Sequence, residues 1–488
     1  MPNRLPITLD RSARTPLSEQ IRKAIAVAID NGVLVPGARL PSWLDLAAQL
    51  GVARGTVRAA YDRLSDAQHI VSSKANGTTV ARRPRTAAKP DTPVAPGPVV
   101  EMFQDLNGQG IFQLGVPAQD TLPAKLLARI RARAVRAELS DVTRYSDPRG
   151  ELALRREIAA HLAIARGLQC SPAQIVVTSG FTGGLGLALR VLGLEGRRAW
   201  MEDPGFPLTR KGLELARLEL VPIPVDADGV DVGHGLKHAP DAALAVVTPG
   251  QQAPLGPALS EKRRAQLLDW AAQTGGWIIE DDYLGELQLD GRAAPALASL
   301  DRAGRVIHLG SFSKTISPTL RLGFLVAPEP LAAQFADVAT CLVPAPGPAV
   351  QLSTAEFMRD GHYIRHLRRT KRAYCNNRDA LTSALRPWSN DVRVAGLAVM
   401  LTLPDKASDV EIARRVLAHG LAPAPLSPWY LSPKRAQPGL LLGIATVPDR
   451  GVPAACKRLF EAIRGQGRTQ GRTQGAQVTR RVRKPAGP

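Results

Sequence analysis

The chain reads Ser311-Phe-Ser-Lys-Thr-Ile-Ser-Pro-Thr-Leu-Arg-Leu-Gly-Phe324 around a lysine, Lys314, that is flanked by hydroxyl side chains. A second run, Ile279-Glu-Asp-Asp-Tyr283, lies upstream of this lysine and continues an apolar, β-type segment. Asp281 and Tyr283 therefore stand where a strand ends, and open α/β sheets bind ligands at the C-terminal ends of parallel strands. We expect the two runs to form one ligand site on such a sheet.

The residue types around Lys314 match the chemical needs of pyridoxal 5′-phosphate. The aldehyde of this cofactor requires a lysine for a Schiff base, and its dianionic phosphate requires hydroxyls, backbone amides and an arginine. Lys314 is the candidate for the Schiff base. Ser311, Ser313 and Arg321 suit a phosphate cup, because arginine binds phosphate in a bidentate fork. A solitary lysine is usually a solvated surface residue, so the prediction rests on the whole ordered set.

The ring of the cofactor needs an acidic partner for its pyridine nitrogen, a donor for its O3′ and a flat face. Three neighbouring carboxylates compete for the nitrogen, namely Glu280, Asp281 and Asp282. Tyr283 is the candidate donor to O3′. Phe206 can lie against the ring, although a Phe after a Pro-Gly pair is more often a plain core residue.

A glycine-rich turn is a second candidate for the phosphate. Ser179-Gly-Phe-Thr-Gly-Gly184 follows a predicted strand at Ile175–Thr178 and opens a predicted helix. Free backbone amides at a helix N-terminus attract anions. Such a turn is a weak indication alone, but beside the residues above it predicts contacts from Gly180, Phe181 and Thr182.

Apolar β-type runs alternate with helical stretches from about residue 100 to residue 465. This alternation is typical of an α/β fold with a mostly parallel sheet. The segment before it is rich in Pro, Ala and basic residues, as in a semi-rigid linker. The basic segment after it has no acidic residue and is predicted to be disordered. We therefore divide the chain into residues 1–80, 81–100, 101–465 and 466–488.

Residues 1–80 are predicted to form a winged helix-turn-helix. The apolar periodicity predicts three helices, at Leu17–Ile29, Trp43–Leu50 and Ala53–Leu64. Ser42 can cap the second helix and Gly51 ends it, because these residue types favour helix N-caps and left-handed C-terminal turns.

The third of these helices is the candidate DNA reader. Arg54, Thr56 and Arg58 crowd its front, where side chains reach base edges and phosphates. Two short strands around Asn76-Gly77 are predicted to form a wing with Gly77 at its tip. A small basic helical domain without a DNA role is the alternative, but the turn residues and the wing together favour DNA binding.

Residues 16–80 resemble the GntR-type winged helix-turn-helix, in which the motifs PGxxLPS and LAxxLGVxRxTV and a glycine-tipped wing recur. The resemblance implies DNA contacts from the three helix residues named above and from the wing tip. Leu44 and Ala53 stand where that family often has an Arg and a Ser or Thr. Each loses a hydrogen bond, so the operator preference is expected to differ from that of typical members.

From Phe103 to Gly465 the chain resembles fold-type I aminotransferases, and with its N-terminal part it is similar to the MocR subfamily of GntR regulators. The similarity is carried by the two runs quoted first and by Tyr145-Ser-Asp-Pro-Arg-Gly150. It implies that Asp281 is the carboxylate at the pyridine nitrogen. It also implies a head-to-tail homodimer in which Tyr145 reaches the cofactor phosphate of the neighbouring subunit.

Two departures from that subfamily bear on the ligand. Thr248-Pro-Gly-Gln-Gln-Ala-Pro-Leu-Gly256 alters the expected pocket wall near the ring. Leu441 stands where aminotransferases place the arginine that clamps the substrate carboxylate, and without it an α-amino acid loses a contact of roughly 1.5–3 kcal/mol. Efficient transamination is therefore doubtful. Three alternatives follow. The effector has no carboxylate at that position, a different arginine binds the carboxylate, or pyridoxal phosphate itself is the signal.

The composition fits a nucleic-acid partner, since the net charge is +20 and the isoelectric point is near 10.4. The four cysteines lack CxxC spacing, which argues against a zinc site. His362 and His366 stand at i, i+4, but their basic run has no acidic ligand, so no metal is expected. No apolar run reaches the ~18 residues of a membrane span and no secretory signal opens the chain, so we expect a cytoplasmic protein without a membrane partner.

Together these observations predict a DNA-binding transcription regulator that senses pyridoxal phosphate, or an amine that reacts with it, through an aminotransferase-like domain. The alternative is a pyridoxal-phosphate-dependent aminotransferase with an appended DNA-binding domain. A third interpretation is a repressor whose larger domain is only a dimerisation scaffold.

Overall fold

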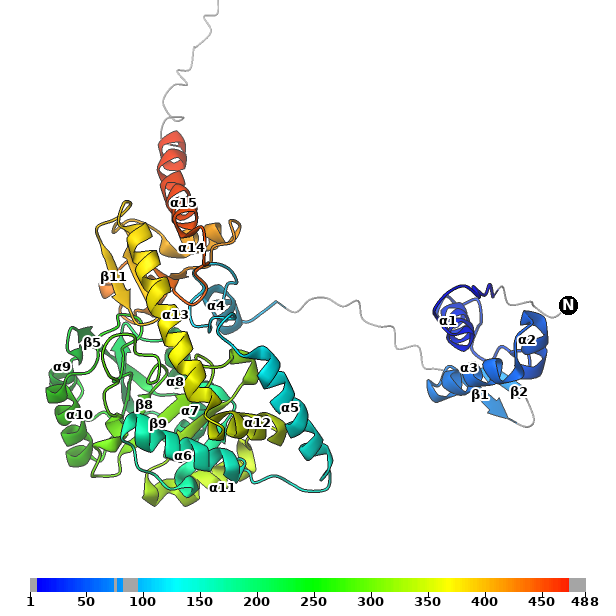
Figure 1. The fold of residues 1–488 in the computed structure, drawn as a ribbon, viewed down its shortest axis with the longest axis horizontal. Coiled ribbons are helices and arrows are strands. Elements are labelled where there is room, and N and C mark those ends of the chain that lie inside the picture. Colours follow the sequence, from blue (N-terminus) through cyan, green and yellow to red (C-terminus); the bar gives the residue numbers. More distant parts are fainter. Residues whose placement is uncertain (1–6, 74–76, 82–94, 474–488) are drawn as a thin grey trace, which may run out of the picture. The chain divides into compact units, whose positions relative to one another are not determined.

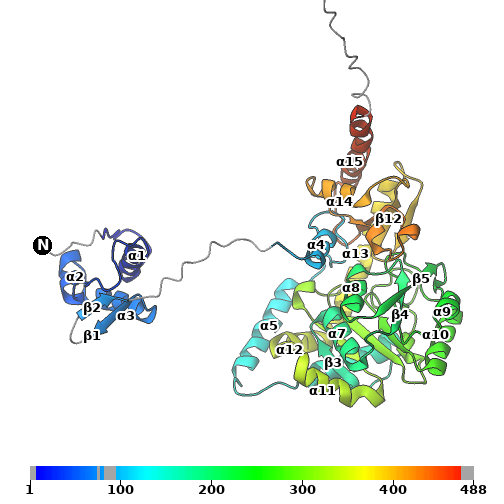
Figure 2. The same cartoon turned by 180° about the vertical axis from the view of Figure 1, so that it is seen from behind.

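The computed structural model describes residues 7–73, 77–81 and 95–473. The chain forms two units, Met1–Ala95 and Pro96–Pro488, which can be followed in Figures 1 and 2. Asn76 at the predicted wing tip, most of the predicted linker and the last part of the predicted tail lie outside the described residues.

The first unit is a winged helix-turn-helix, as predicted. Its elements are α1 (Leu17–Asp30), α2 (Trp43–Leu50), α3 (Arg54–Asp66), β1 (Ile70–Ser73) and β2 (Gly77–Val80). Ser42 accepts a hydrogen bond from the backbone N–H of Asp45 at 3.1 Å, and Gly51 closes the same helix with a φ of 61°. Both are the capping contacts that the sequence predicted.

One apolar cluster holds the first unit together. The inward face of α3 contributes the fully buried Val57, Ala60 and Leu64, which pack with residues of α1 and α2. The strands β1 and β2 form an antiparallel pair. The outer face of α3 is therefore left for a partner.

The larger part of the second unit is built on an eight-stranded sheet. Its strands are β3 (Ile175–Thr178), β4 (Arg198–Asp203), β5 (Glu219–Asp226), β6 (Gly229–Val230), β7 (Leu244–Val247), β8 (Trp277–Asp281), β9 (Val306–Ser311) and β10 (Gly323–Val326). They are ordered β3-β10-β9-β8-β7-β4-β5-β6. The pairs from β9 to β5 are parallel, and β10 is antiparallel to both its neighbours. The mostly parallel α/β sheet predicted from the sequence is confirmed.

Helices surround this sheet in Figures 1 and 2. They are α5 (Ala124–Leu139), α6 (Leu152–Arg166), α7 (Gly180–Leu192), α8 (Pro207–Leu215), α9 (Val232–His238), α10 (Glu261–Thr274), α11 (Ala332–Leu342), α12 (Pro348–Arg359) and α13 (His362–Leu385). Short 3-10 helices lie at Pro172–Gln174, Leu297–Ser299, Pro318–Leu320, Glu329–Leu331, Ser427–Trp429 and Pro433–Arg435.

Neighbouring residues of each central strand enter different apolar clusters. In β8, Ile278 packs in the cluster of Trp200 and Trp270, whereas Ile279 packs in the cluster of Leu185. This alternation follows from the period of two along a strand, and it buries the sheet on both faces. The same alternation determines on which face of the sheet each carboxylate at the end of β8 lies.

A smaller part of the second unit contains a four-stranded antiparallel sheet. Its strands are β11 (Val392–Ala395), β12 (Ala398–Thr402), β13 (Ala424–Pro425) and β14 (Gly439–Gly443), in the order β11-β12-β14-β13. The same part of the unit also contains the helices α14 (Asp409–Leu417) and α15 (Val452–Thr473). The backbone of α15 continues past Gly465, where we expected the disordered tail to begin, as far as Thr473.

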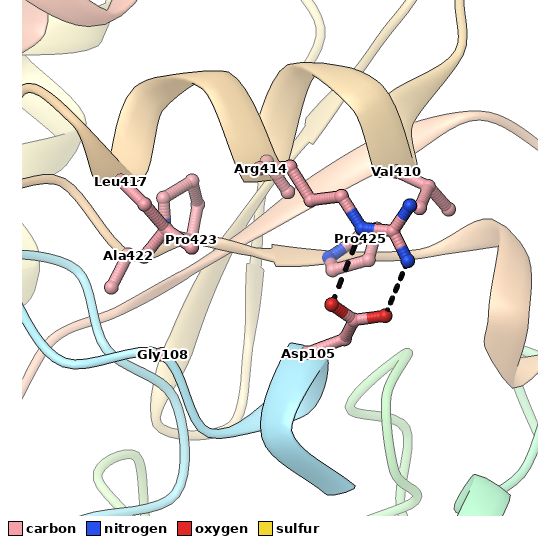
Figure 3. A pocket seen from close by; sticks show the side chains of 9 residues that line it. Asp105, Gly108, Val410, Arg414, Leu417, Ala422, Pro423 and Pro425 are labelled. Carbon is pink, nitrogen blue, oxygen red and sulfur yellow. Dashed lines mark hydrogen bonds and ion pairs between the residues drawn. The ribbon is translucent and has the colours of Figure 1, made fainter. Parts of the chain in front are cut away.

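The first helix of the second unit, α4 (Pro98–Leu106), is attached to this smaller part. Figure 3 shows the contact, in which the guanidinium of Arg414 donates to both carboxylate oxygens of Asp105 at 3.2 and 2.7 Å. A Cβ on Gly108 would lie 2.7 Å from a terminal methyl of Leu417, so a larger residue would require that side chain to shift. Ile111 then forms a parallel β-bridge with Leu421. The crevice between α4 and α14 holds only about 10 Å³ and is remote in sequence from Lys314.

Candidate functional site

Three carboxylates stand at the end of β8, and the structure separates them by their partners. Glu280 is fully buried and accepts hydrogen bonds from the backbone N–H groups of Leu297 and Ala298 at 2.7 and 3.0 Å. Nδ1 of His308 lies 3.0 Å from the same carboxylate. Burial alone would raise the pKa of Glu280, but His308 outweighs it and holds this pKa below its usual value. Glu280 is therefore engaged within the protein through both of its oxygens.

Asp282 is also engaged. Nε and Nη2 of Arg166 donate to its two oxygens at 2.8 and 2.9 Å, and both side chains are buried. Nε2 of His308 lies 3.8 Å from the same carboxylate. The imidazole of His308 thus lies between Glu280 and Asp282, on the side of β8 opposite to Asp281.

Asp281 is the carboxylate without a comparable partner. Burial, then the charges of Asp282 and Glu202, raise the pKa of Asp281 to about 8, while Lys314 lowers it. Such an acid needs a nearby cation to be ionised at neutral pH. The structure therefore favours Asp281, over its two neighbours, as the group that faces a ligand.

Lys314 lies on the loop after β9, and its Nζ donates to the carbonyl oxygen of Gly115 at 2.6 Å. Burial lowers the pKa of Lys314, and the charge of Asp281 opposes this change. A lowered pKa favours the neutral amine, which is the nucleophilic form. Gly115 has a φ of 77°, and a Cβ there would lie 2.9 Å from Nζ, so a larger residue would crowd the amine.

Tyr283 follows Asp281 by two residues and shares its surroundings. Burial, followed by the charges of Asp281 and Glu202, raises the pKa of Tyr283. Its phenol therefore keeps its proton and remains a hydrogen-bond donor at neutral pH. Glu202 itself accepts hydrogen bonds from the N–H and Oγ1 of Thr248 at 3.0 and 2.6 Å.

The residues predicted to bind the phosphate come from two parts of the chain that lie side by side. Gly180 begins α7 with a φ of 76°, and Nη2 of Arg321 donates to Oγ1 of Thr182, in the first turn of that helix, at 3.2 Å. Oγ of Ser311 accepts a hydrogen bond from the backbone N–H of Ser313 at 3.2 Å. The α7 N-terminus and the loop around Lys314 therefore form one polar edge of the sheet.

The side chains of three other predicted site residues do not join this polar edge. The side chain of Phe181 packs against the apolar cluster on the face of the sheet, so this residue has only its backbone to offer a ligand. Phe206 lies at the start of α8, with its ring centroid 5.4 Å from that of Trp429. Tyr145 is 99% exposed on the loop between α5 and α6 and does not join the other residues within one chain.

The predicted DNA contacts share the outer side of α3. Arg54 and Arg58 are exposed and Thr56 is partly exposed, at the front of the helix. Gly77 begins β2 with a φ of 68°, and a Cβ there would lie 3.3 Å from the guanidinium of Arg39. Arg39 was not singled out from the sequence; it lies in the PGxxLPS motif, and the structure places it beside the first residue of β2.

His362 and His366 do not form a pair of ligands. Nε2 of His366 lies 2.6 Å from the carbonyl oxygen of Thr315, and its Nδ1 lies 3.3 Å from that of Thr121. His366 is buried by these contacts. Among the described residues, no group of three or more His, Cys, Asp or Glu side chains is arranged to hold a metal ion, and none of the helices could span a membrane.

Comparison with known proteins matches both units. Residues 17–80 match the bacterial regulatory proteins of the gntR family, and residues 111–459 match the aminotransferases of class I and II. The chain is 32% identical over 464 residues to the probable rhizopine catabolism regulatory protein MocR of Rhizobium meliloti. The aligned residues make up 90% of this chain and 92% of that protein. The chain belongs to the MocR-type GntR regulators.

Other proteins similar to this MocR-type chain extend the comparison. The pyridoxine biosynthesis transcriptional regulator PdxR of Corynebacterium glutamicum is 33% identical over 455 residues, which are 91% of this chain and 95% of that protein. The kynurenine aminotransferase of Pyrococcus horikoshii aligns with a TM-score of 0.67 at 24% identity, covering 78% of this chain and 98% of that one. An archaeal alanine:glyoxylate aminotransferase aligns with a TM-score of 0.69 at 25% identity, covering 76% and 96%. The fold-type I aminotransferase fold predicted for the larger domain is confirmed.

The aminotransferase class I and II fold of this MocR-type chain implies binding of pyridoxal phosphate. Two observations test whether its residues fit. The half-buried acid Asp281 has a raised pKa and lacks a strong cationic partner, which a protonated pyridine nitrogen would supply. Because residue 115 is a glycine, it has no Cβ, which would lie 2.9 Å from Nζ of Lys314 and crowd the amine. The donor set therefore fits the cofactor.

Proposed function

We propose that this chain is a cytoplasmic DNA-binding transcription regulator whose second unit senses pyridoxal phosphate or a primary amine that reacts with it. The observation that carries this proposal is the pairing, on one chain, of an exposed helix-turn-helix face with a half-buried Lys314 and a half-buried Asp281 whose pKa is raised. The relatives named as regulators, including one of pyridoxine biosynthesis, support it.

Each residue has a distinct part in this proposal. Lys314 would hold the cofactor, Asp281 would pair with its ring nitrogen, and Tyr283 would donate to its O3′. Gly180, Thr182, Ser311, Ser313 and Arg321, with the backbone amide of Phe181, would bind the phosphate. The bound cofactor supplies an electrophilic carbonyl carbon that condenses with primary amines.

We further propose that the regulator acts as a head-to-tail homodimer. Tyr145 does not reach the other site residues of its own chain and is almost fully exposed. Its phenol is therefore available for the phosphate of a second copy. Phe206 would lie against the ring of the cofactor, between it and Trp429.

The mechanism that we propose is a shift of population. A ligand moves a two-state equilibrium only by its difference in affinity for the two states. Occupation of the site at Lys314 is expected to favour one arrangement of the sheets of the second unit, and thereby one placement of the two DNA readers of a dimer.

The direct test is the affinity of the full chain for the DNA upstream of its own coding region, with and without saturating pyridoxal phosphate at fixed salt. A cofactor-dependent change supports sensing. Specific binding that ignores both the cofactor and added amines contradicts it. Absence of specific binding would favour the alternative, an aminotransferase with an appended DNA-binding domain, which must turn over many times with amino donors and keto-acid acceptors.

The double variant Arg54→Ala/Arg58→Ala is expected to lower that DNA affinity by at least about 30-fold, because each arginine supplies a phosphate or base contact worth roughly 1–3 kcal/mol and the two together about 2 kcal/mol or more. Binding measured at several salt concentrations should also show a shallower salt dependence. Arg63→Ala is the control, because Arg63 lies on the same helix and is paired with Glu19. Equal losses in both variants would mean that Arg54 and Arg58 make no specific contact and that the losses reflect only the reduced charge of α3.

Asp281→Asn is expected to stabilise the cofactor-free protein at pH 8 and to leave it unchanged near pH 4. The carboxyl has a raised pKa in the folded state, so the folded state holds a proton that the unfolded state has lost. Stability therefore falls as pH rises from about 4 to about 8, and the amide removes this loss. Unfolding midpoints at both pH values measure it, with the exposed Asp269→Asn as control.

The same Asp281→Asn variant should bind pyridoxal phosphate more weakly than the wild type, because an amide cannot neutralise a pyridinium. A variant that gains stability and keeps full cofactor affinity would remove Asp281 from the site.

A further inference from the structure

A pocket of about 570 Å³ lies in the second unit, and none of the residues proposed to hold the cofactor lines it. Its walls are one face of α6, one face of α13 and the loop that follows Tyr283. The lining positions on α6 recur at intervals of three and four residues from Glu157, and those on α13 recur likewise from Ile364, which is the spacing of a single helix face. Pockets of about 300–1,000 Å³ typically hold small ligands. The size of this pocket therefore suits a small molecule.

One wall of this pocket is linked to the residue after Lys314. The phenol of Tyr363, which lines the pocket from α13, donates a hydrogen bond to Oγ1 of Thr315 at 3.1 Å. Both side chains are buried, and Thr315 directly follows Lys314. A ligand that moves Tyr363 would therefore act on the segment that carries the reactive amine.

A second wall is linked to the residue after Asp281. Gly285 lines the pocket, and a Cβ there would lie 2.5 Å from a carboxylate oxygen of Asp282 and 2.8 Å from Nε of Arg166. The backbone of the loop is thus packed against the buried ion pair that Asp282 and Arg166 form. Asp282 directly follows Asp281. The pocket is therefore in contact, through two different walls, with the neighbours of two proposed cofactor residues.

The inner wall of the pocket, where the side chains are largely buried, carries a paired acid. Oε1 of Glu286 lies 3.1 Å from Nε2 of His161. Burial alone would raise the pKa of Glu286, but the hydrogen bond and the charge of His161 outweigh it and hold this pKa below its usual value. The ring of His161 also packs edge-on against that of Tyr363, with 5.4 Å between the centroids. The carboxylate of Glu286 therefore has its partner within the protein and needs no cationic ligand.

The rim of the pocket is cationic. Arg292 comes from the loop, and Arg368 and Lys371 stand three residues apart on α13. Nζ of Lys371 donates to the carbonyl oxygen of Gly291 at 3.4 Å, so this amine lies beside the loop that carries Arg292. Both arginines are exposed, and neither has an ion-pair partner among the side chains that the structure describes. Glu157 is the acid of the rim, so three cations stand against one carboxylate there.

Apolar side chains complete the pocket. Ile164 on α6 and Ile364 on α13 are 78% and 43% exposed, whereas Met358 and Leu367 are buried. An apolar ligand body that covers the two isoleucines would remove their surface from water, which is favourable. The pocket thus offers apolar contact together with positive charge, the two features that bind an amphipathic anion.

We infer that this pocket binds a small organic anion with an apolar body, and that the bound anion changes the affinity of the chain for pyridoxal phosphate. The anionic group, a carboxylate or a phosphate, would be held by the three cations of the rim. The change in affinity would pass through Tyr363 and Gly285, because these residues contact the neighbours of the proposed cofactor residues. This second part rests on the proposed function, since it takes Lys314 as the residue that holds the cofactor.

The test compares indole-3-acetate with indole-3-acetamide, two probes that share the apolar ring and differ in charge. The full chain is loaded with pyridoxal phosphate and titrated with each probe in a calorimeter. The acetate is expected to bind at least about fivefold more tightly, because charge-assisted contacts to arginine persist on a partly exposed rim although water weakens them. Equal affinity of the two probes, or no binding of the acetate at millimolar concentration, would overturn the inference.

Variants of the lining locate the bound probe. Arg368→Ala/Lys371→Ala is expected to lower the affinity for indole-3-acetate by at least about fivefold without changing that for the acetamide. Ala160→Trp should abolish binding of both probes, because the introduced side chain would fill the pocket from an exposed position of α6. Arg372→Ala is the control, because Arg372 is exposed on α13 but does not line the pocket. A double variant that weakens DNA binding and leaves the probe affinity unchanged would assign the rim to DNA and contradict the inference.

The coupling is measured as the affinity for pyridoxal phosphate with and without saturating indole-3-acetate. A shift of at least about threefold is expected, and linkage requires that the cofactor change the affinity for the probe by the same factor. Tyr363→Phe keeps the ring and loses the hydrogen bond to Thr315, so it should reduce the shift while the probe still binds. Tyr374→Phe is the control, because Tyr374 is buried on the same helix and does not line the pocket. A shift that Tyr363→Phe leaves unchanged would contradict this route.

Failure of this inference and failure of the proposed function give different results. A chain that takes up no cofactor contradicts the proposed function and the coupling, but the two probes still decide whether the pocket binds an anion. A loaded chain that does not distinguish the probes contradicts only this inference. A loaded chain that prefers the acetate and keeps its cofactor affinity unchanged supports the binding site and contradicts the coupling.

Discussion

Lys314→Ala is expected to abolish the visible absorbance of the cofactor-loaded protein and to make its DNA affinity independent of pyridoxal phosphate. The reason is that this amine lies beside Asp281, has a lowered pKa and is held at a glycine that leaves it uncrowded. Without it the cofactor would be held only by its phosphate and ring contacts. The measurement is an absorbance spectrum after gel filtration, followed by DNA binding with and without the cofactor.

Lys211→Ala is the matched control for that variant. Lys211 lies on α8 of the same unit, and its Nζ bonds Glu214 at 2.5 Å on the surface. It should keep both the absorbance and the cofactor-dependent DNA affinity. If Lys314→Ala loses the absorbance but regulation is unchanged, the cofactor is bound without being sensed and the proposed function is wrong.

Arg166→Met is expected to lower the free energy of unfolding by about 3–5 kcal/mol, because it leaves the buried charge of Asp282 without its partner. The guanidinium also donates to the carbonyl oxygen of Ala294, so the variant breaks a second contact. The loss should appear in denaturant-induced unfolding of the cofactor-free chain. It also should disturb the end of β8, and with it the position of Asp281.

Arg393→Met is the control for this effect. Arg393 is paired with Asp391, and both side chains are exposed, by 70% and 47%. Exposed pairs of this kind contribute about 0–1 kcal/mol, so the control should unfold almost as the wild type does. The double variant Arg166→Met/Asp282→Leu should recover much of the lost stability, since no unpaired charge remains. A loss in Arg166→Met no larger than that of the control would mean that Asp282 finds another partner.

The sequence predicted the position of the site but not the assignment of its carboxylates. Glu280, Asp281 and Asp282 are equivalent as a run of letters, and only the resemblance to a family favoured the middle one. The structure separates them by partners that are distant in the sequence. Arg166 ends α6 and His308 lies in β9, and neither could be connected with β8 before the sheet order was known.

Local signals predicted the first unit almost completely, because its caps and turns are made by neighbouring residues. Side-chain direction in the second unit was harder to predict. Phe181 was expected to contribute its backbone amide at the start of α7, and nothing in the sequence indicated that its partly buried side chain packs against the apolar cluster of the sheet. His366 was recognised as half of a histidine pair, but its burial against Thr315 and Thr121 depends on long-range packing.

The attachment of α4 fixes the start of the second unit. This helix begins at Pro98, inside the segment that we predicted as linker, and it is joined to α14 by Asp105 and Arg414. The following residues continue the contact through the bridge of Ile111 with Leu421. We propose that a displacement of the four-stranded sheet would move α4 with it, because these contacts join the two. In this proposal Asp105 and Arg414 transmit the change, and they can be altered without touching the residues proposed to bind the ligand.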